Sequence, residues 1–286
     1  SYFELTEAKL LVAVVEQSIR DRTIIANLVR ARFQRGLVRG LDVRLALTDL
    51  ANAEAELKEA RNLLQSISRR LEILLGDYPA GQEMASTALP PLPDAVPAGL
   101  PAELLERRPD VIAAFKRLQA DDLGTVSAEK LRLPRVTLTA AGGTRSNDLT
   151  ELIDPRSAAW NVFAGLMQPL FTGGRITGEI FRNKALAEEA LNLYKNTALN
   201  AFREVEQALA AEEWLRQQEV ALRKAVEQTE SSQKLAVYSY RQGLIEIITL
   251  LDSYRSTLNA QMAHLAVSRQ LLSNRVTLYL ALGGHV

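Results

Sequence analysis

Two copies of one short stretch decide the fold: FQRGLV at residues 33–38 and YRQGLI at residues 240–245. Each copy sets a Gly-Leu pair between two long stretches of helix-forming residues. Because glycine is the usual residue where a helix ends and the chain reverses, each copy predicts the tip of a helical hairpin. The two tip glycines are 207 residues apart, and Leu75-Gly76 recurs as Leu282-Gly283 at the same offset. This fixed offset indicates an internal duplication.

Proline placement separates the two ends of the chain from its middle. None of the ten prolines lies in residues 1–78 or 170–286, and six of them fall between Pro79 and Pro101. A proline costs about 3 kcal/mol in a helix interior, so the ends are free to form long helices and the middle is not. Residues 179–242 contain neither glycine nor proline and would span about 96 Å as one helix.

The middle of the chain shows three further patterns. Residues 77–108 hold the proline cluster and predict an extended, irregular segment, which a helix over 109–133 follows. Apolar and polar residues alternate over 135–141, and residues 160–168 form a second strand candidate. Both have about the length, roughly 9–11 residues, of a tilted strand that crosses a bilayer. A soluble hairpin packed on a helix is an equally good interpretation of this pattern.

The composition excludes several classes of protein. The 34 basic and 34 acidic residues leave no net charge that would attract nucleic acid. The chain has no cysteine and only two histidines, so disulfides, thiolate sites and histidine-based metal sites are not expected. No apolar run reaches the ~18–20 residues of a membrane-spanning helix. No phosphate loop or pairing of nucleophile and base is visible, so we expect no enzyme activity and no cofactor.

The duplication also predicts what would precede the chain. Shifting the two strand candidates back by 207 residues places their first copies before Ser1. Residues 1–35 would then be only the lower part of a long helix. We therefore expect a C-terminal fragment that lacks at least about 100 residues, including two strands and the helix that leads into them.

Three motifs carry a resemblance to a known family. They are LPAELLERRPD at 100–110, PLFTGGR at 169–175 and AFREVEQAL at 201–209. Together with the two tips, they make the chain similar to the TolC-like outer-membrane efflux proteins, in the branch of drug-efflux outer-membrane factors. The resemblance implies a mainly α fold, in which very long antiparallel helices form the hairpins of a trimeric α-helical tube. It also implies two β-strands of a shared transmembrane β-barrel and an irregular belt at mid-height.

The family pattern assigns a place to each segment. The expected parts are a first periplasmic helical hairpin truncated at its N-terminal end (1–76), an equatorial proline-rich belt (77–108), an upper helix (109–133), two barrel strands (134–171), a long second hairpin (172–283) and a C-terminal tail (284–286). Such a protein would lie in the outer membrane of a Gram-negative bacterium, with a large periplasmic part.

The implied function is passive conduction. As a homotrimer in contact with outer-membrane lipid, the protein would be the channel of a tripartite efflux system. It would carry drugs or other small solutes to the outside from a periplasmic adaptor (membrane fusion) protein and an inner-membrane pump. It would be gated at the periplasmic helix tips, and it would need no nucleic acid, cofactor or metal.

The resemblance also assigns candidate residues. The adaptor-contact tips are Gly36, Leu37, Val38, Gly243, Leu244 and Ile245. Glycine would end a helix in any case, but two apolar residues after it at an exposed turn favour a contact surface. Ile248 and Asp252 stand where family channels narrow, and an aspartate ring there would favour cations. On the residues alone, a solvated helix residue is the favoured interpretation of Asp252.

A tip lock between neighbouring helices is a further implication. Asp42 and Tyr240 occupy the positions of a pair that hydrogen-bonds in some family members, so we expect them to bond in the closed state. The positions of a second acid and of a lock arginine hold Thr249 and Ile245, which argues against a double acidic ring and against that arginine lock.

Two other classes of protein remain as alternatives. A structural or adaptor-like periplasmic coiled-coil protein would have one hairpin flanked by small β-domains. The duplicated tips and the two strands of membrane length count against it. An enzyme is the remoter alternative, since Thr172-Gly173-Gly174 before a helix is only a weak anion-site signal.

Overall fold

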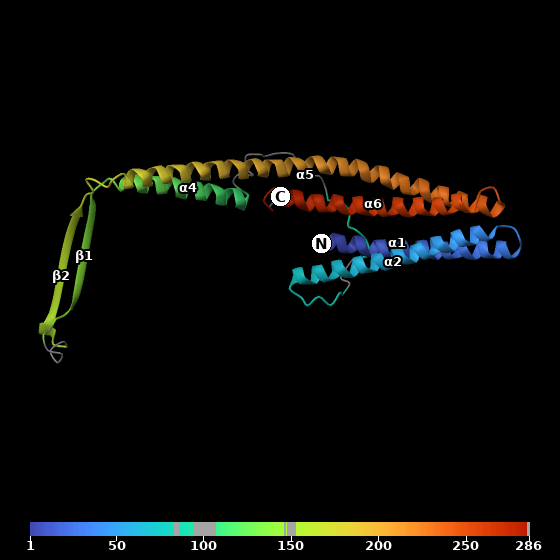
Figure 1. Cartoon of the computed structure of the whole chain (residues 1–286), viewed down its shortest axis with the longest axis horizontal. Coiled ribbons are helices and arrows are strands. Elements are labelled where there is room, and N and C mark those ends of the chain that lie inside the picture. The colour runs from blue at the N-terminus through green and yellow to red at the C-terminus, as the bar shows by residue number, and fades with distance from the viewer. Residues whose placement is uncertain (83–85, 94–106, 146, 148–152, 285–286) are drawn as a thin grey trace. The chain divides into compact units, whose positions relative to one another are not determined.

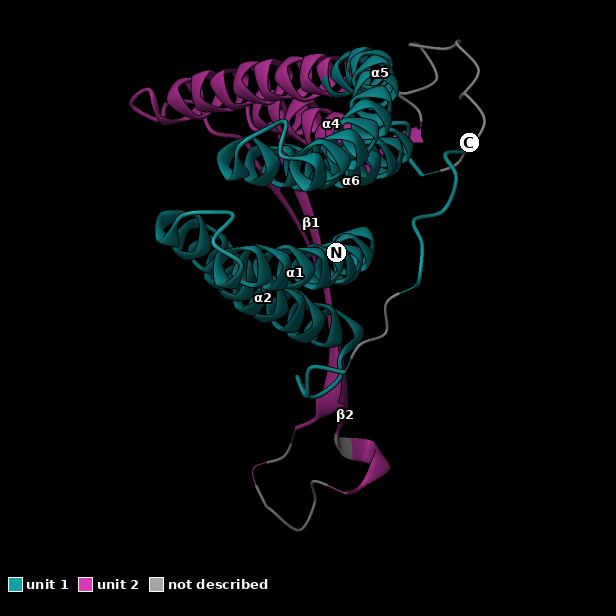
Figure 2. Ribbon diagram, turned by 90° about the vertical axis from the view of Figure 1, so that its right-hand side faces the viewer, with its two compact units in different colours: residues 1–99, 204–286 teal, residues 100–203 magenta. Residues whose placement is uncertain are grey.

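The computed structural model describes residues 1–82, 86–93, 107–145, 147 and 153–284. Contacts divide the chain into two compact units, Ser1–Gly99 with Glu204–Val286 and Leu100–Arg203 (Figure 2). Among the described residues, no helix has both the length and the apolar character that crossing a bilayer would require. The parts of the predicted belt at 83–85 and 94–106, most of the motif at 100–110, and tail residues 285–286 lie outside the described residues.

The first unit contains two helical hairpins (Figure 1). The first hairpin is α1 (Tyr2–Gln34) and α2 (Gly40–Leu75). The second hairpin is α6 (Ile247–Ala281) with the part of α5 (Arg175–Gln242) that follows residue 203. The long helices predicted from the absence of glycine and proline are confirmed. The longest begins at Arg175, four residues earlier than the pattern indicated, because Gly178 is accommodated inside it.

The duplicated glycines adopt the same turn. Gly36 and Gly243 have φ of 72° and 77°, and Gly76 and Gly283 have φ of 87° and 90°. At Gly36, the glycine N–H donates to the Phe33 carbonyl at 2.9 Å, and the next N–H donates to the Arg32 carbonyl at 3.0 Å. The other three turns repeat this pair of bonds. It is the left-handed cap that satisfies the last carbonyls of a helix, so the repeat visible in the sequence is a repeat of backbone geometry.

The tip end of the first unit has a common core. Its buried side chains come from all four helices: Ile25, Ala26, Val29, Ala46, Tyr240, Ile247, Leu250, Leu251 and Tyr254. A second cluster, made of Leu5, Ala8, Leu64 and Leu71, lies between α1 and α2 near their other ends. Since burying one large aliphatic side chain stabilises by about 1.5–3 kcal/mol, the first cluster fixes the two tips as one packed body.

Part of the proline-rich segment is anchored to the helix ends by buried charges. Glu72 of α2 is 2% exposed, and its carboxylate accepts the backbone N–H groups of Gly81 and Gln82 at 2.8 and 2.7 Å. Ser68 donates to the Gln82 carbonyl at 2.5 Å. These bonds hold the chain where it leaves α2, in a region where proline and glycine prevent a regular ladder.

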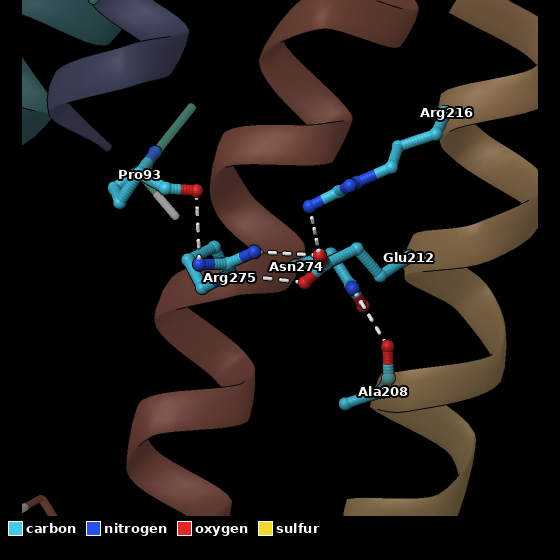
Figure 3. Close-up of polar contacts among 6 residues, drawn as sticks. All are labelled: Pro93, Ala208, Glu212, Arg216, Asn274 and Arg275. Carbon is cyan, nitrogen blue, oxygen red and sulfur yellow. Dashed lines mark hydrogen bonds and ion pairs between the residues drawn. The ribbon is translucent and has the colours of Figure 1, made fainter. Parts of the chain in front are cut away.

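The second anchor of that segment comes from α6 (Figure 3). Arg275 is 2% exposed and pairs with Glu212 of α5 through bonds of 2.9 and 2.5 Å, while it donates to the Pro93 carbonyl at 3.2 Å. Arg216 adds a bond to the same carboxylate at 2.8 Å. These hydrogen bonds, led by that from Arg275, hold the pKa of Glu212 below its ordinary value. The described belt stretches 77–82 and 86–93 are therefore each held by a buried polar side chain of a helix, Glu72 and Arg275 respectively.

The second unit holds α4 (Pro109–Lys130), β1 (Arg135–Thr144), the short helix η2 (Pro155–Ser157), β2 (Ala158–Met167) and the part of α5 before residue 204. Phe115 of α4 lies 5.6 Å from Tyr194 of α5, measured between ring centroids, and Lys184 pairs with Glu129 at 3.2 Å. The long helix thus packs on α4 in this unit. α4 ends three residues before the predicted residue 133.

The two strands pair antiparallel and have two unlike faces. Directly opposed residues share a face, and the register begins with Arg135 opposite Met167 and ends with Thr144 opposite Ala158. One face is apolar except for Thr144 at its end, and its other residues are Val136, Leu138, Ala140, Gly142, Ala158, Trp160, Val162, Ala164 and Leu166. The other mixes Arg135, Thr137, Thr139 and Asn161 with apolar residues. All twenty positions are exposed, so neither face is packed on a helix, and the soluble-hairpin alternative is wrong for the chain as described.

Candidate functional site

The two tips divide their apolar pair in the same way. Leu37 is 61% exposed and Leu244 is 73% exposed. The residues that follow them, Val38 and Ile245, pack against the common core of the tips. Each left-handed glycine therefore turns one leucine outward while the next side chain holds the turn to the protein. An apolar group presented at the end of a rigid hairpin is suited to bind a partner surface.

The first tip is capped by its own helix. The Arg39 N–H donates to the Asp42 carboxylate at 3.0 Å, and the Asp42 N–H donates to the Arg39 carbonyl at 3.0 Å. This reciprocal pair satisfies two of the donors that the first turn of α2 would otherwise leave free. The carboxylate also lies at the positive end of the helix dipole.

The second tip is held from the other hairpin. Arg32 of α1 donates through Nη1 to the carbonyls of Tyr240 and Arg241 at 2.7 and 3.2 Å. Its guanidinium carbon lies 5.1 Å from the centre of the Tyr240 ring. Burial raises the pKa of the Tyr240 hydroxyl, and the positive charge of Arg32 opposes that rise.

Within the described residues, Tyr240 and Asp42 make no hydrogen bond, and the lock expected in the closed state stays a prediction. The Tyr240 hydroxyl is buried and has no hydrogen-bond partner among the described residues. The bond that the Asp42 carboxylate makes is at the cap of α2, where it accepts the Arg39 N–H. Tyr240 instead enters the core through its ring, with the guanidinium of Arg32 against it.

The candidate gate residues lie on the outer side of α6. Ile248 is 59% exposed, and Asp252, one turn later, is also exposed. The opposite side of the same turns is buried through Ile247, Leu250 and Leu251. Both candidates therefore point away from the core of their own chain. Among the described residues, no cluster of three or more His, Cys, Asp or Glu side chains could hold a metal ion.

Sequence reasoning missed the buried charges that join the hairpins. Asp49 of α2 is 1% exposed, and its carboxylate accepts bonds of 2.8 and 2.7 Å from Arg255 of α6. Arg22 of α1 is 3% exposed, lies 3.4 Å from the same carboxylate and donates to the Asp49 carbonyl at 3.2 Å. One sequence signal could have indicated the buried charge of Asp49. This residue lies between Ala46 and Ala53 at helical spacing, so it is a charged residue on an apolar helix face.

A further ion pair between the hairpins lies toward the other end of the first unit. Arg269 of α6 donates to Glu7 of α1 at 2.8 Å. Contacts between the hairpins are thus present near the tip through Arg32, further along through Asp49, and at the far end through Glu7. Arg32 is the one whose bonds reach the tip itself.

Known proteins share both the sequence and the fold of this chain. The chain is 32% identical over 99% of its length to the outer membrane protein OprJ of Pseudomonas aeruginosa, and 34% identical over 90% to the toluene efflux pump outer membrane protein TtgF of Pseudomonas putida. It spans 60% of the first protein and 54% of the second, less than two thirds of either. The solved outer-membrane channel OprN matches 99% of the chain with a TM-score of 0.92 and 27% identity, and the chain covers 64% of that structure.

A family model supports the same assignment. The model described as "Outer membrane efflux protein" matches residues 100–284, well over half of the chain. The match contains all three motifs and begins at the first residue of the first one. The resemblance drawn from those motifs and from the tips is confirmed: the chain belongs to the outer membrane efflux protein family, and its place is the outer membrane.

Proposed function

We propose that the chain forms part of the channel of a tripartite efflux system. The channel would pass drugs or other small solutes outward from a periplasmic adaptor and an inner-membrane pump. The observation that carries the proposal is the pair of matching tips, each with an outward leucine on a left-handed glycine turn. Family membership and the names of the relatives support it.

The strands support a place for the second unit in the membrane. β1 and β2 have ten residues each and one face that is apolar except for Thr144 at its end. A two-stranded ribbon is marginally stable in water and presents unpaired backbone groups at both edges. We propose that strands of further copies pair with those edges in a shared barrel of a homotrimer. The apolar face would then meet lipid.

The gate in this proposal is a ring of Ile248 and Asp252 from three copies. Both side chains leave their own core, as a lumen-facing position requires. An apolar ring narrows a pore by dewetting, and an aspartate ring favours cations. In this arrangement, residues 1–76 and 172–283 are periplasmic hairpins, 77–108 the belt, 109–133 the upper helix and 134–171 the membrane strands.

Complementation tests this function. The complete protein, expressed in a host that lacks its own outer-membrane efflux component but retains adaptor and pump, should restore resistance to toluene and to antibiotics. It should also conduct ions in a planar lipid bilayer. Leu37→Asp combined with Leu244→Asp should abolish resistance and leave conduction and membrane abundance unchanged, because the charges act only at the tips. A protein that neither complements nor conducts would support the structural or adaptor-like alternative instead.

A further inference from the structure

We propose that Arg32 is the residue that latches the second tip, and that it does so from the first hairpin. The inference rests on the proposed channel function and adds a positioning residue to it. The geometry assigns three contacts to one guanidinium: two backbone carbonyls at the end of α5 and the face of the Tyr240 ring.

The carbonyl contacts act on the turn itself. Tyr240 and Arg241 belong to the last turn of α5, where helix carbonyls have no partner within the helix. The Tyr240 carbonyl already accepts the Gly243 N–H at 3.0 Å, and Arg32 adds a second, charged donor at 2.7 Å. A cation at a helix C-terminus also interacts favourably with the helix dipole. Arg32 therefore stabilises the conformation from which Gly243 and Leu244 are presented.

The ring contact ties the same guanidinium to the core. Tyr240 is 4% exposed and belongs to the cluster shared by both hairpins. Arg32 lies against its ring, at a distance that suits a cation–π interaction. The hydroxyl takes no part in this arrangement, since it has no partner among the described residues. Tyr240 would serve the latch through its ring and its carbonyl, which a phenylalanine would also supply.

The position of Arg32 gives these contacts a role in opening. It lies four residues before Gly36, and its acceptors lie two and three residues before Gly243. Any movement that separates the second tip from the first must break all three contacts. The ion pairs of Asp49 and Glu7 lie further from the tips and can persist during such a movement. Arg32 would thus hold the tip closed while the remainder of the two hairpins stays docked.

Channel recordings with matched variants test the latch. In the complete protein in a planar lipid bilayer, Arg32→Ala should raise the open probability at least about tenfold, because a hydrogen bond to a charged group is worth about that factor. Arg30→Ala is the control, since it removes the same charge from an exposed position two residues away on the same helix. An Arg32→Ala channel that behaves like Arg30→Ala overturns the proposal.

A distance measurement keeps the latch separate from the channel function. The chain has no cysteine, so spin labels can be placed at Gln34→Cys and Gln242→Cys, two exposed positions beside the tip glycines. Arg32→Ala should lengthen and broaden the distance between the labels within one protomer, and Arg32→Lys should do so less. Unchanged distances overturn the latch. A wild-type protein that conducts no ions would refute the channel instead, whatever the distances show.

Discussion

The two tips have the same turn but are stabilised by different parts of the chain. The first tip is followed by Asp42, whose carboxylate caps the helix that it belongs to. The helix after the second tip has Glu246 as its N-cap residue, and the Glu246 side chain makes no cap hydrogen bond. In the helix before the second tip, the carbonyls of the last turn instead accept hydrogen bonds from Arg32 of the first hairpin. The hydrogen bonds at the first tip therefore come from its own hairpin, whereas some at the second tip come from the first hairpin, and both tips pack on one shared core.

This difference separates two roles within a duplicated architecture. A self-capped turn keeps its shape when its neighbour moves, so the first tip is suited to be the fixed element. A turn held by a side chain of the other hairpin can change its conformation when that contact breaks. The second tip is therefore suited to be the element that moves. The candidate gate residues Ile248 and Asp252 follow the second tip, which agrees with this assignment.

The largest expected effect tests whether the hairpins stay joined. Asp49→Ala removes the carboxylate that Arg255 and the buried Arg22 share, and should lower the free energy of unfolding by about 3–5 kcal/mol. Thermal unfolding followed by circular dichroism would measure it. Glu54→Ala, an exposed acid on the same helix, should change little. Similar midpoints for the two variants would mean that the buried charges do not hold the hairpins together.

A second test compares the two turns directly. Gly36→Ala and Gly243→Ala each place a side chain at positive φ, which costs about 1–2 kcal/mol, so their unfolding free energies should fall by equal amounts. No atom lies within 4 Å of a Cβ built at Gly36, and the Arg32 Nη2 lies 3.8 Å from one at Gly243. Gly178→Ala is the control and should stabilise α5 slightly. If chemical denaturation gave clearly different losses of unfolding free energy for the two variants, the two turns would differ in strain despite their similar φ angles.

A third test addresses the self-cap of the first tip. Asp42→Ala should lower the free energy of unfolding by about 1 kcal/mol and fray the first turn of α2. The reason is that the Arg39 N–H loses the carboxylate that accepts it. Hydrogen exchange at the first-turn amides of α2 would report the fraying. Asp42→Asn retains an acceptor and should exchange more slowly than the alanine variant. Fraying that extends to the second tip would contradict the independence of the first.

The smallest effect is expected at the tyrosine hydroxyl. Tyr240→Phe removes a buried group that has no partner among the described residues, so the free energy of unfolding should change by less than about 0.5 kcal/mol or rise. Chemical denaturation of Tyr240→Phe and of Tyr240→Ala, which also loses the ring, would compare the unfolding free energies of the two variants. A loss of stability as large as that of the alanine variant would mean that the hydroxyl makes a bond after all.

The fold was largely predictable because its signals are local. Glycine at the tips and the distribution of proline mark helix ends wherever they occur, and the alternation over 135–141 marks a strand. The strands extend beyond the predicted limits, to Arg135–Thr144 and Ala158–Met167, because the ladder continues past the alternating residues into glycine and alanine.

The contacts within the site were not predictable in the same way. Arg32 and Tyr240 are 208 residues apart in the sequence, and their meeting depends on how two hairpins pack. Motif positions pointed to Asp42 as the partner of Tyr240, whereas in the described chain the Asp42 carboxylate accepts the Arg39 N–H. The buried role of Asp49 needed the same knowledge of packing, although its place in an apolar stripe was visible.

The register of the β-hairpin has a consequence for how this protein tolerates change. Even-numbered positions from Val136 to Gly142 and from Trp160 to Leu166 all lie on one face. Removing a single residue inside β2 would transfer Trp160 and Val162 to the face of Arg135 and Thr139. Removing two would restore the order. Length variation in the strands is therefore confined to even steps, whereas the loop between Thr144 and Ala158 can gain or lose residues of either parity.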